Sequence, residues 1–176
     1  MSFIPDPETA PDPVTQLSAA ERAFYARQLI LPEIGMAGQL KLKAARVAVL
    51  GAGGLGAPAL LYLAGAGVGE IIIIDDDSIE ISNLHRQVIH SYARAGNSKA
   101  ESAAETMRAL NPFITVTVIR ERLTDSNALT LLTGTDAVLD GSDNFEARYA
   151  VSAAAQQFGI PHIWAAILGF DAQLSV

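Results

Sequence analysis

The chain has 176 residues, half of them hydrophobic, with a net charge of −7 and no cysteine. This length and apolar content predict one domain with its own core, and the acidic balance argues against a broad nucleic-acid or anionic-membrane surface. The lack of thiols excludes disulfides, thiolate catalysis and cysteine-bound zinc within these residues. No apolar run reaches about eighteen residues, and no signal-peptide pattern is present, so we expect a cytoplasmic protein without a membrane span.

The N-terminal part reads as an arm followed by a folded domain. Residues 1–16 carry four prolines among acidic residues, a composition typical of a disordered or loosely held arm. The folded domain is expected over 17–176. Ser18 begins a capping-box pattern that predicts a helix as far as about Leu29, and a further helical turn is expected over 39–44.

Strands and helices then alternate along the chain. Helices are expected over 56–66, 98–110, 125–132 and 145–158, and strands over 46–50, 70–75, 114–119, 137–140 and 162–166. In the strand 114–119, threonines alternate with apolar residues, which favours a sheet edge. This alternation predicts an α/β fold, a doubly wound, mostly parallel Rossmann-like sheet with helices on both faces, and ligands beyond the carboxyl ends of its strands.

A glycine-rich turn follows the first of these strands and reads Gly51-Ala52-Gly53-Gly54-Leu55-Gly56. Its glycines, Gly51, Gly53, Gly54 and Gly56, would let the backbone approach phosphate at a helix N-terminus. Asp75 closes the next strand, at the spacing of an acid that binds a ribose hydroxyl. The pattern predicts a nucleotide site without specifying the nucleotide. A solvated strand-end acid is the alternative for Asp75 and the expectation for Asp76 and Asp77.

Charged residues follow at later strand ends. Arg86 and Lys99 come after the strand that Asp75 closes, and Asp143 follows the strand 137–140. The two cations could neutralise a triphosphate, and the carboxylate could hold magnesium. Alternatively, the cations are ordinary surface charges and Asp143 caps the following helix. Their joint position after successive strands favours a site for ATP and magnesium.

With these motifs in place, the chain resembles the ThiF/MoeB/HesA adenylyltransferases, relatives of the ubiquitin-activating enzymes. The resemblance covers residue 22 to about 176. The matching pieces are Tyr25-Ala26-Arg27-Gln28, the glycine turn, Asp75-Asp76-Asp77, Ser82-Asn83-Leu84-His85-Arg86-Gln87, Lys99, and Asp143-Asn144 with Arg148.

The resemblance implies a reaction and its partners. Proteins of this family adenylate the C-terminal glycine carboxylate of a small ubiquitin-like sulfur carrier, of the molybdopterin or thiamine type, and release pyrophosphate from ATP. It also implies that Arg27 reaches the ATP of a neighbouring subunit, so a homodimer is expected. The residues expected to act in catalysis are Arg27, Arg86, Lys99 and Asp143.

The resemblance also implies nucleotide contacts. Gly54 would lie against the nucleotide, Asp75 would hold the ribose, and Asp143 would serve the magnesium ion with Asn144 beside it. The residues expected to contact the phosphates are Asn83, Arg86 and Lys99. The neighbours Ser82, Leu84 and His85 are grouped with the nucleotide-binding residues.

The chain also departs from the family pattern. The family's zinc-binding Cys-x-x-Cys pairs and its reactive cysteine lie beyond the matched stretch, so the sequence resembles an N-terminal part that ends within a strand continuing past Gln173. Apolar surface is then expected to be uncovered, at Ile167, Leu168, Phe170 and Leu174.

Alternative functions remain. The glycine turn and Asp75 alone would also suit an NAD-dependent oxidoreductase. A truncated chain could bind nucleotide without turnover. The family branch that dehydrates a modified adenosine in transfer RNA fits the acidic charge less well. Among the other residues, His162 is expected to be structural, Trp164 to lie in the core and Tyr62 to pack within its helix.

Overall fold

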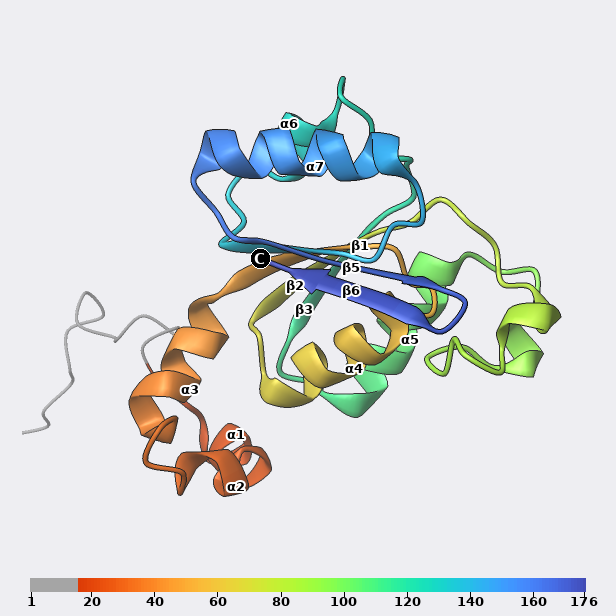
Figure 1. Ribbon diagram of the computed structural model, residues 1–176. Coiled ribbons are helices and arrows are strands. Elements are labelled where there is room, and N and C mark those ends of the chain that lie inside the picture. Colours follow the sequence, from red (N-terminus) through yellow and green to blue (C-terminus); the bar gives the residue numbers. More distant parts are fainter. Residues whose placement is uncertain (1–15) are drawn as a thin grey trace, which may run out of the picture.

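The computed structural model describes residues 16–176 (Figure 1). The arm expected over 1–16 lies outside the described residues except for Gln16. The helices are α1 (Ala19–Phe24), α2 (Ala26–Leu29), α3 (Gly35–Ala44), α4 (Gly56–Ala66), α5 (Lys99–Leu110), α6 (Ala128–Leu131) and α7 (Phe145–Phe158), with 3-10 turns η3 (Ile81–Asn83) and η4 (Tyr92–Arg94). The strands are β1 (Arg46–Leu50), β2 (Glu70–Ile74), β3 (Thr115–Ile119), β4 (Ala137–Asp140), β5 (His162–Leu168) and β6 (Asp171–Ser175).

The strands form one sheet in the order β3-β2-β1-β4-β5-β6. The first five are parallel, and the chain order reverses beside β1, so the predicted doubly wound, mostly parallel sheet is confirmed. β3 is an edge strand, as its threonine pattern indicated. β6 pairs with β5 in the antiparallel direction. The turn between them, with Gly169 at a φ of 62°, is too short for a parallel crossover.

Helices cover both faces of the sheet, with α4 and α5 on one face and α6 and α7 on the other (Figure 1). β1 and β2 send alternate side chains to the two cores. Val49 and Ile73 pack in the core under α4 and α5, whereas Ala48 and Ile72 pack in the core under α6 and α7. Burial on both faces explains why these strands are continuous apolar runs.

The outer strands are much less covered. Every residue of β6 is exposed, and the side chains of Leu168 and Phe170 in and after β5 are almost wholly accessible. The apolar surface predicted at this end of the sheet is confirmed, since all four of its residues are exposed: Ile167, Leu168, Phe170 and Leu174.

The N-terminal helices differ in detail from the prediction. The capping box at Ser18 is present, with Glu21 donating its N–H to Ser18 Oγ at 3.1 Å. The single helix expected to Leu29 is instead divided at Tyr25, whose buried hydroxyl accepts from Asn111 Nδ2 at 2.8 Å. α3 begins at Gly35, earlier than expected. No helix in the described part of the chain combines the length and apolar character needed to cross a bilayer.

Candidate nucleotide-binding site

The fold requires two of the four glycines in the turn after β1. Gly51 has a φ of 88° and donates its N–H to Ile74 O at 2.9 Å. A Cβ on Gly56 would lie 1.8 Å from Gly51 O. Any side chain at Gly56 would therefore force this turn open, and α4 could not begin there.

The other two glycines have room around them. A Cβ on Gly53 would meet only the Gln87 amide at 3.7 Å, and a Cβ on Gly54 would meet only the Arg86 side chain at 3.6 Å. Packing of the described residues does not demand glycine at either position. Their bare backbone, at the N-terminus of α4 and beneath an arginine, is what close approach by a phosphate requires.

Asp75 is tied to the turn and is not a solvated acid. Its Oδ2 accepts from Ala52 N at 2.7 Å and its Oδ1 accepts from Asp77 N at 2.9 Å. Burial raises the pKa of the Asp75 carboxyl, and the two backbone N–H groups and nearby Lys99 partly oppose this rise. The acid thus fixes the position of the turn and remains at the carboxyl end of β2.

Lys99 lies at the same end of the sheet, at the start of α5. Its side chain is 8% exposed, and Nζ forms an ion pair with Asp77 Oδ2 at 2.7 Å. Asp77 is exposed as expected, with 62% of its side chain accessible, but it also holds this buried lysine. Asp76 fits the expectation of a solvated acid better, because its nearest ion-pair contact is at 3.9 Å, with exposed Arg122.

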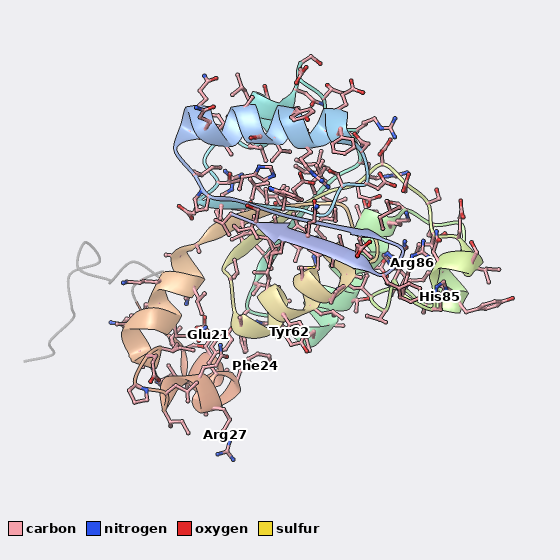
Figure 2. The ribbon with its side chains drawn as sticks, viewed as in Figure 1. Glu21, Phe24, Arg27, Tyr62, His85 and Arg86 are labelled. Carbon is pink, nitrogen blue, oxygen red and sulfur yellow. The ribbon has the colours of Figure 1, made fainter. Side chains whose placement is uncertain are left out.

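The segment after β2 brings Arg86 over the glycine turn. Arg86 Nη2 donates to Asn83 Oδ1 at 2.9 Å, and the arginine side chain lies against Gly54. His85 projects beside Arg86 from the same loop (Figure 2). The remaining residues of this motif are less engaged: Ser82 donates to Glu80 at 3.3 Å, and Leu84 is half-buried.

His90 and Ser102 also support the turn, although no sequence pattern indicated this role for them. His90 Nε2 lies 3.0 Å from Ala52 O, and Nδ1 lies 3.1 Å from Ser102 Oγ. Because a carbonyl can only accept, Nε2 carries the hydrogen and Nδ1 accepts from the serine. Burial lowers the pKa of His90, which favours this neutral form.

The loop after β4 places Asp143 at the other side of the turn. Gly141 donates its N–H to Leu50 O at 3.0 Å, and its backbone lies against Gly51. Asn144 caps α7, since its Oδ1 accepts from Ala147 N at 2.9 Å. The alternative in which Asp143 forms this cap is therefore wrong. Asp143 is exposed and has no hydrogen bond or ion pair to the described residues.

Arg27 is not brought to this centre within one chain. Figure 2 shows it projecting from the N-terminal helices at the bottom of the view, away from Arg86 at the right. The remaining predicted residues do gather: the glycine turn, Asp75, Lys99, Asn83 with Arg86, and the Asp143 loop lie together at the carboxyl ends of β1, β2 and β4.

The charged side chains of the site fit a nucleotide triphosphate better than a metal cluster held by the protein alone. Within residues 16–176, no group of three or more histidine, aspartate or glutamate side chains is placed to hold a metal. One exposed carboxylate, that of Asp143, suits magnesium, which usually keeps waters and phosphate oxygens as its other ligands.

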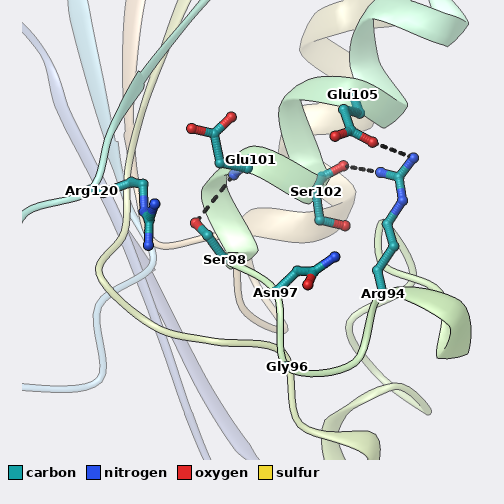
Figure 3. A pocket seen from close by; sticks show the side chains of 8 residues that line it. All are labelled: Arg94, Gly96, Asn97, Ser98, Glu101, Ser102, Glu105 and Arg120. Carbon is teal, nitrogen blue, oxygen red and sulfur yellow. Dashed lines mark hydrogen bonds and ion pairs between the residues drawn. The ribbon is translucent and has the colours of Figure 1, made fainter.

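Two cavities flank the centre. One, of about 360 Å³, lies beside the N-terminus of α5 and contains the Arg94–Glu105 ion pair (Figure 3). The other, of about 790 Å³, runs between α7 and the outer strands and is lined by Phe145, Arg148 and Trp164 among others. Trp164 is only half-buried and Tyr62 is 81% exposed, so the packing roles predicted for these two residues are wrong.

Fold and site together define a doubly wound α/β protein with a nucleotide-type turn at its topological switch point. The sequence profile of the ThiF family matches residues 25–176, and the chain belongs to that family. Among curated relatives, it is 52% identical over 165 residues to the probable adenylyltransferase/sulfurtransferase MoeZ of Mycobacterium tuberculosis, covering 94% of this chain and 42% of MoeZ. It is 48% identical to the sulfur carrier protein adenylyltransferase of Thermus thermophilus, covering 86% of this chain and 56% of that protein.

Solved structures agree with the fold. Escherichia coli tRNA N6-threonylcarbamoyladenosine dehydratase, TcdA, in complex with ATP matches with a TM-score of 0.79 and 30% identity, over 84% of this chain and 60% of TcdA. E. coli MccB matches with a TM-score of 0.73 and 33% identity, over 78% of this chain and 41% of MccB. The chain spans between 39% and 58% of the length of three curated relatives that it matches, namely MoeZ, the Yarrowia lipolytica UBA4 and the Haloferax volcanii SAMP-activating enzyme E1.

Proposed function

We propose that the protein is an ATP-dependent adenylyltransferase that activates the C-terminal glycine carboxylate of a small ubiquitin-like sulfur carrier. One observation carries this proposal: the glycine turn lies against the Arg86 side chain and against Gly141, which begins the loop that contains Asp143, and Asp75 ties the turn to the segment whose Asp77 pairs with Lys99. Sequence identity of 48–52% to proteins named adenylyltransferases supports it.

The reaction needs positioning and charge neutralisation more than a protein nucleophile. A carboxylate oxygen of the carrier forms a bond to the α-phosphorus of ATP, and the bond from that phosphorus to the bridging oxygen breaks, releasing pyrophosphate. Both reactants are anionic, so cations that contact the phosphates lower the barrier. In this proposal Arg86 and Lys99 supply those contacts with Asn83, Asp75 binds the ribose, and the bare backbone at Gly54 lies against the nucleotide.

Magnesium belongs to the same proposal. Asp143 would hold the ion, which when bound neutralises phosphate charge. Asn144 lies beside it but is engaged as the helix cap. Lys99 keeps one contact to Asp77 and has two further N–H groups for phosphate oxygens.

The identity of the partner protein is the more specific part of the proposal. Relatives named for a sulfur carrier protein and for sulfurtransferase activity favour a sulfur carrier as the partner. In this proposal the carrier is of the molybdenum-cofactor or thiamine type and the reaction is cytoplasmic. Identity to the tRNA dehydratase is lower, at 30%, and the net charge of −7 does not favour an RNA partner.

A homodimer would explain Arg27. The arginine lies away from the site of its own chain (Figure 2), and apolar side chains exposed near it would suit a subunit contact, namely Phe24, Ile30, Leu31 and Met36. A second subunit would then bring its Arg27 to the phosphates.

The test is ATP–pyrophosphate exchange in the presence of a carrier. We expect exchange by the wild type, a loss of about 10²–10³-fold in Arg86→Ala, as for other oxyanion-stabilising groups, and a similar loss in Asp143→Ala. Wild-type exchange after Asp143→Ala would overturn the assignment of that residue. Tight NADH binding without ATP binding would favour an oxidoreductase, and ATP binding without exchange would indicate a nucleotide-binding protein without turnover.

A further inference from the structure

A well-buried arginine next to the candidate site has no assigned role in the proposed reaction. Arg148 lies in α7, four residues after Asn144, and its side chain is 14% exposed. Its Nη2 donates to Ser142 O at 2.9 Å and also approaches Ala165 O at 3.4 Å. The guanidinium carbon lies 4.6 Å from the centre of the Trp164 ring, a cation–π distance.

A fully buried acid completes this arrangement from the other side. Asp140, the last residue of β4, accepts from Ser142 N at its Oδ1, at 2.8 Å. Its Oδ2 lies 3.1 Å from His162 Nε2 and 3.8 Å from Arg148 Nε. Both backbone polar groups of Ser142 are therefore held by side chains, the N–H by Asp140 and the carbonyl by Arg148.

The flanking residues of the loop are held as well. Gly141 donates to Leu50 O at 3.0 Å, and the Asn144 side chain accepts from Ala147 N at 2.9 Å. Two side chains of the 141–144 loop have no hydrogen bond to the described chain: the Ser142 hydroxyl, which is buried, and the Asp143 carboxylate, which is exposed. Asp143 therefore offers the accessible unpaired group, although the backbone on both sides of it is fixed. Such a loop presents one carboxylate in a defined position.

We propose that Arg148 is a positioning residue that holds the 141–144 loop so that Asp143 can bind the magnesium of Mg·ATP. This inference rests on the proposed function. Arg148 would act through Asp143, because its Nη2 already donates to Ser142 O and Ala165 O, its Nε faces the buried Asp140 carboxylate at 3.8 Å, and its guanidinium lies over the Trp164 ring. Loss of Arg148 should therefore weaken magnesium binding and leave the metal-free affinity for ATP unchanged.

Lysine cannot replace this arginine. An ammonium is a point charge without a planar face, so it cannot stack on Trp164 and reach two carbonyls at once. Loss of groups that orient a metal ligand typically costs about 10–100-fold in metal affinity. We expect Arg148→Lys and Arg148→Met to raise the half-saturating magnesium concentration in ATP binding by about that factor.

The experiment is calorimetric titration of the full chain with ATP, in EDTA and across a magnesium series. Asp143→Ala serves as the reference for complete loss of the magnesium effect. Arg108→Lys is the matched control, because Arg108 also donates to a backbone carbonyl, Val116 O at 2.6 Å, but lies in α5 on the other face of the sheet. Thermal unfolding of each variant checks that it is folded.

The supporting result is a weakened magnesium effect in both Arg148 variants, unchanged ATP affinity in EDTA and a control that behaves as wild type. Equal loss of ATP affinity with and without magnesium would overturn the proposal, because it would indicate a general structural role. A wild-type magnesium response in Arg148→Lys would also overturn it. If Arg148→Met does not fold, Arg148→Lys and Trp164→Leu, which removes the stacked ring, decide the question. Absence of any magnesium effect in the wild type would instead refute the proposed function.

Discussion

Strands β1 and β2 are buried along four of their five residues, whereas no residue of β5 is fully buried and β6 is exposed throughout. The first pair lies between two helical layers, and the outer pair has only α7 near one face (Figure 1). The glycine turn and Asp75 extend from the enclosed strands. The Asp143 loop follows β4, at the boundary between the two regions.

This comparison teaches that the two sides of the candidate site are held differently. At the enclosed side, backbone contacts and buried side chains such as Asp75 and His90 fix the turn. At the open side, the loop depends on individual bonds from Asp140 and Arg148. We therefore expect substitutions in the enclosed strands to affect stability, and substitutions near β5 and β6 to be tolerated by the fold.

The largest expected difference in stability is between alanine substitutions at two glycines, Gly56 in the enclosed region and Gly169 in the open region. In Gly56→Ala the new methyl group would meet Gly51 O at 1.8 Å, so we expect a loss of about 4 kcal/mol or more in the free energy of unfolding. Gly169→Ala adds a Cβ with open space around it, and only the positive φ opposes it, at about 1 kcal/mol. Urea denaturation of both variants measures the difference, and equal losses would contradict it.

A smaller difference is expected between apolar side chains of similar size. Ile72 in β2 is 1% exposed and packs under α6 and α7, so Ile72→Ala should lose about 3 kcal/mol through lost burial and the resulting cavity. Leu168 in β5 is 86% exposed, so Leu168→Ala should change the free energy of unfolding by less than about 0.5 kcal/mol. A comparable loss in Leu168→Ala would show that β5 is covered in solution.

The smallest effect is a change with pH. The lowered pKa of His90 means that its folded form binds a proton less readily than the unfolded chain does. Its contribution to stability is therefore complete above the unfolded value of about 6.5 and is lost as the pH falls through the folded value. We expect His90→Gln to cost about 1 kcal/mol at neutral pH.

The informative quantity is how the free energy lost in His90→Gln changes with pH. The free energy of unfolding should fall less steeply between pH 7 and 5 in His90→Gln than in the wild type, as measured by urea denaturation at each pH. Taking the difference between the two proteins removes the contribution of Asp75, whose raised pKa acts with the opposite sign. Parallel curves would mean that His90 does not titrate differently on folding.

Much of the fold could be predicted because its signals are local. Continuous apolar runs mark strands buried on both faces, and the glycine turn with Asp75 marks the switch point. The break at Tyr25 was not predictable, because it follows from a tertiary hydrogen bond to Asn111, 86 residues along the chain. The partial burial of Trp164 and the exposure of Tyr62 likewise depend on what packs against them, and apolar character alone does not reveal it.

The candidate site likewise has features that the sequence predicts and features that it does not. Arg86 and Lys99 follow β2 and Asp143 follows β4, the two strands on either side of β1, so the topology predicts that these residues lie at the same edge of the sheet. The Lys99–Asp77 ion pair and the contacts of His90 depend on side-chain geometry that no spacing encodes. The roles assigned to the predicted residues remain predictions until the variants are measured.

Asp75 has a consequence for how this site can be dissected by mutagenesis. Both of its oxygens already accept backbone N–H groups, from Ala52 and Asp77. Asparagine, the usual isosteric choice, would turn one acceptor into an NH₂ group that faces another donor, and the turn would have to shift. Lost ATP affinity in Asp75→Asn would thus combine a missing ribose contact with a displaced phosphate cradle. An ATP analogue without the ribose hydroxyls, titrated against the unaltered protein, separates these two contributions.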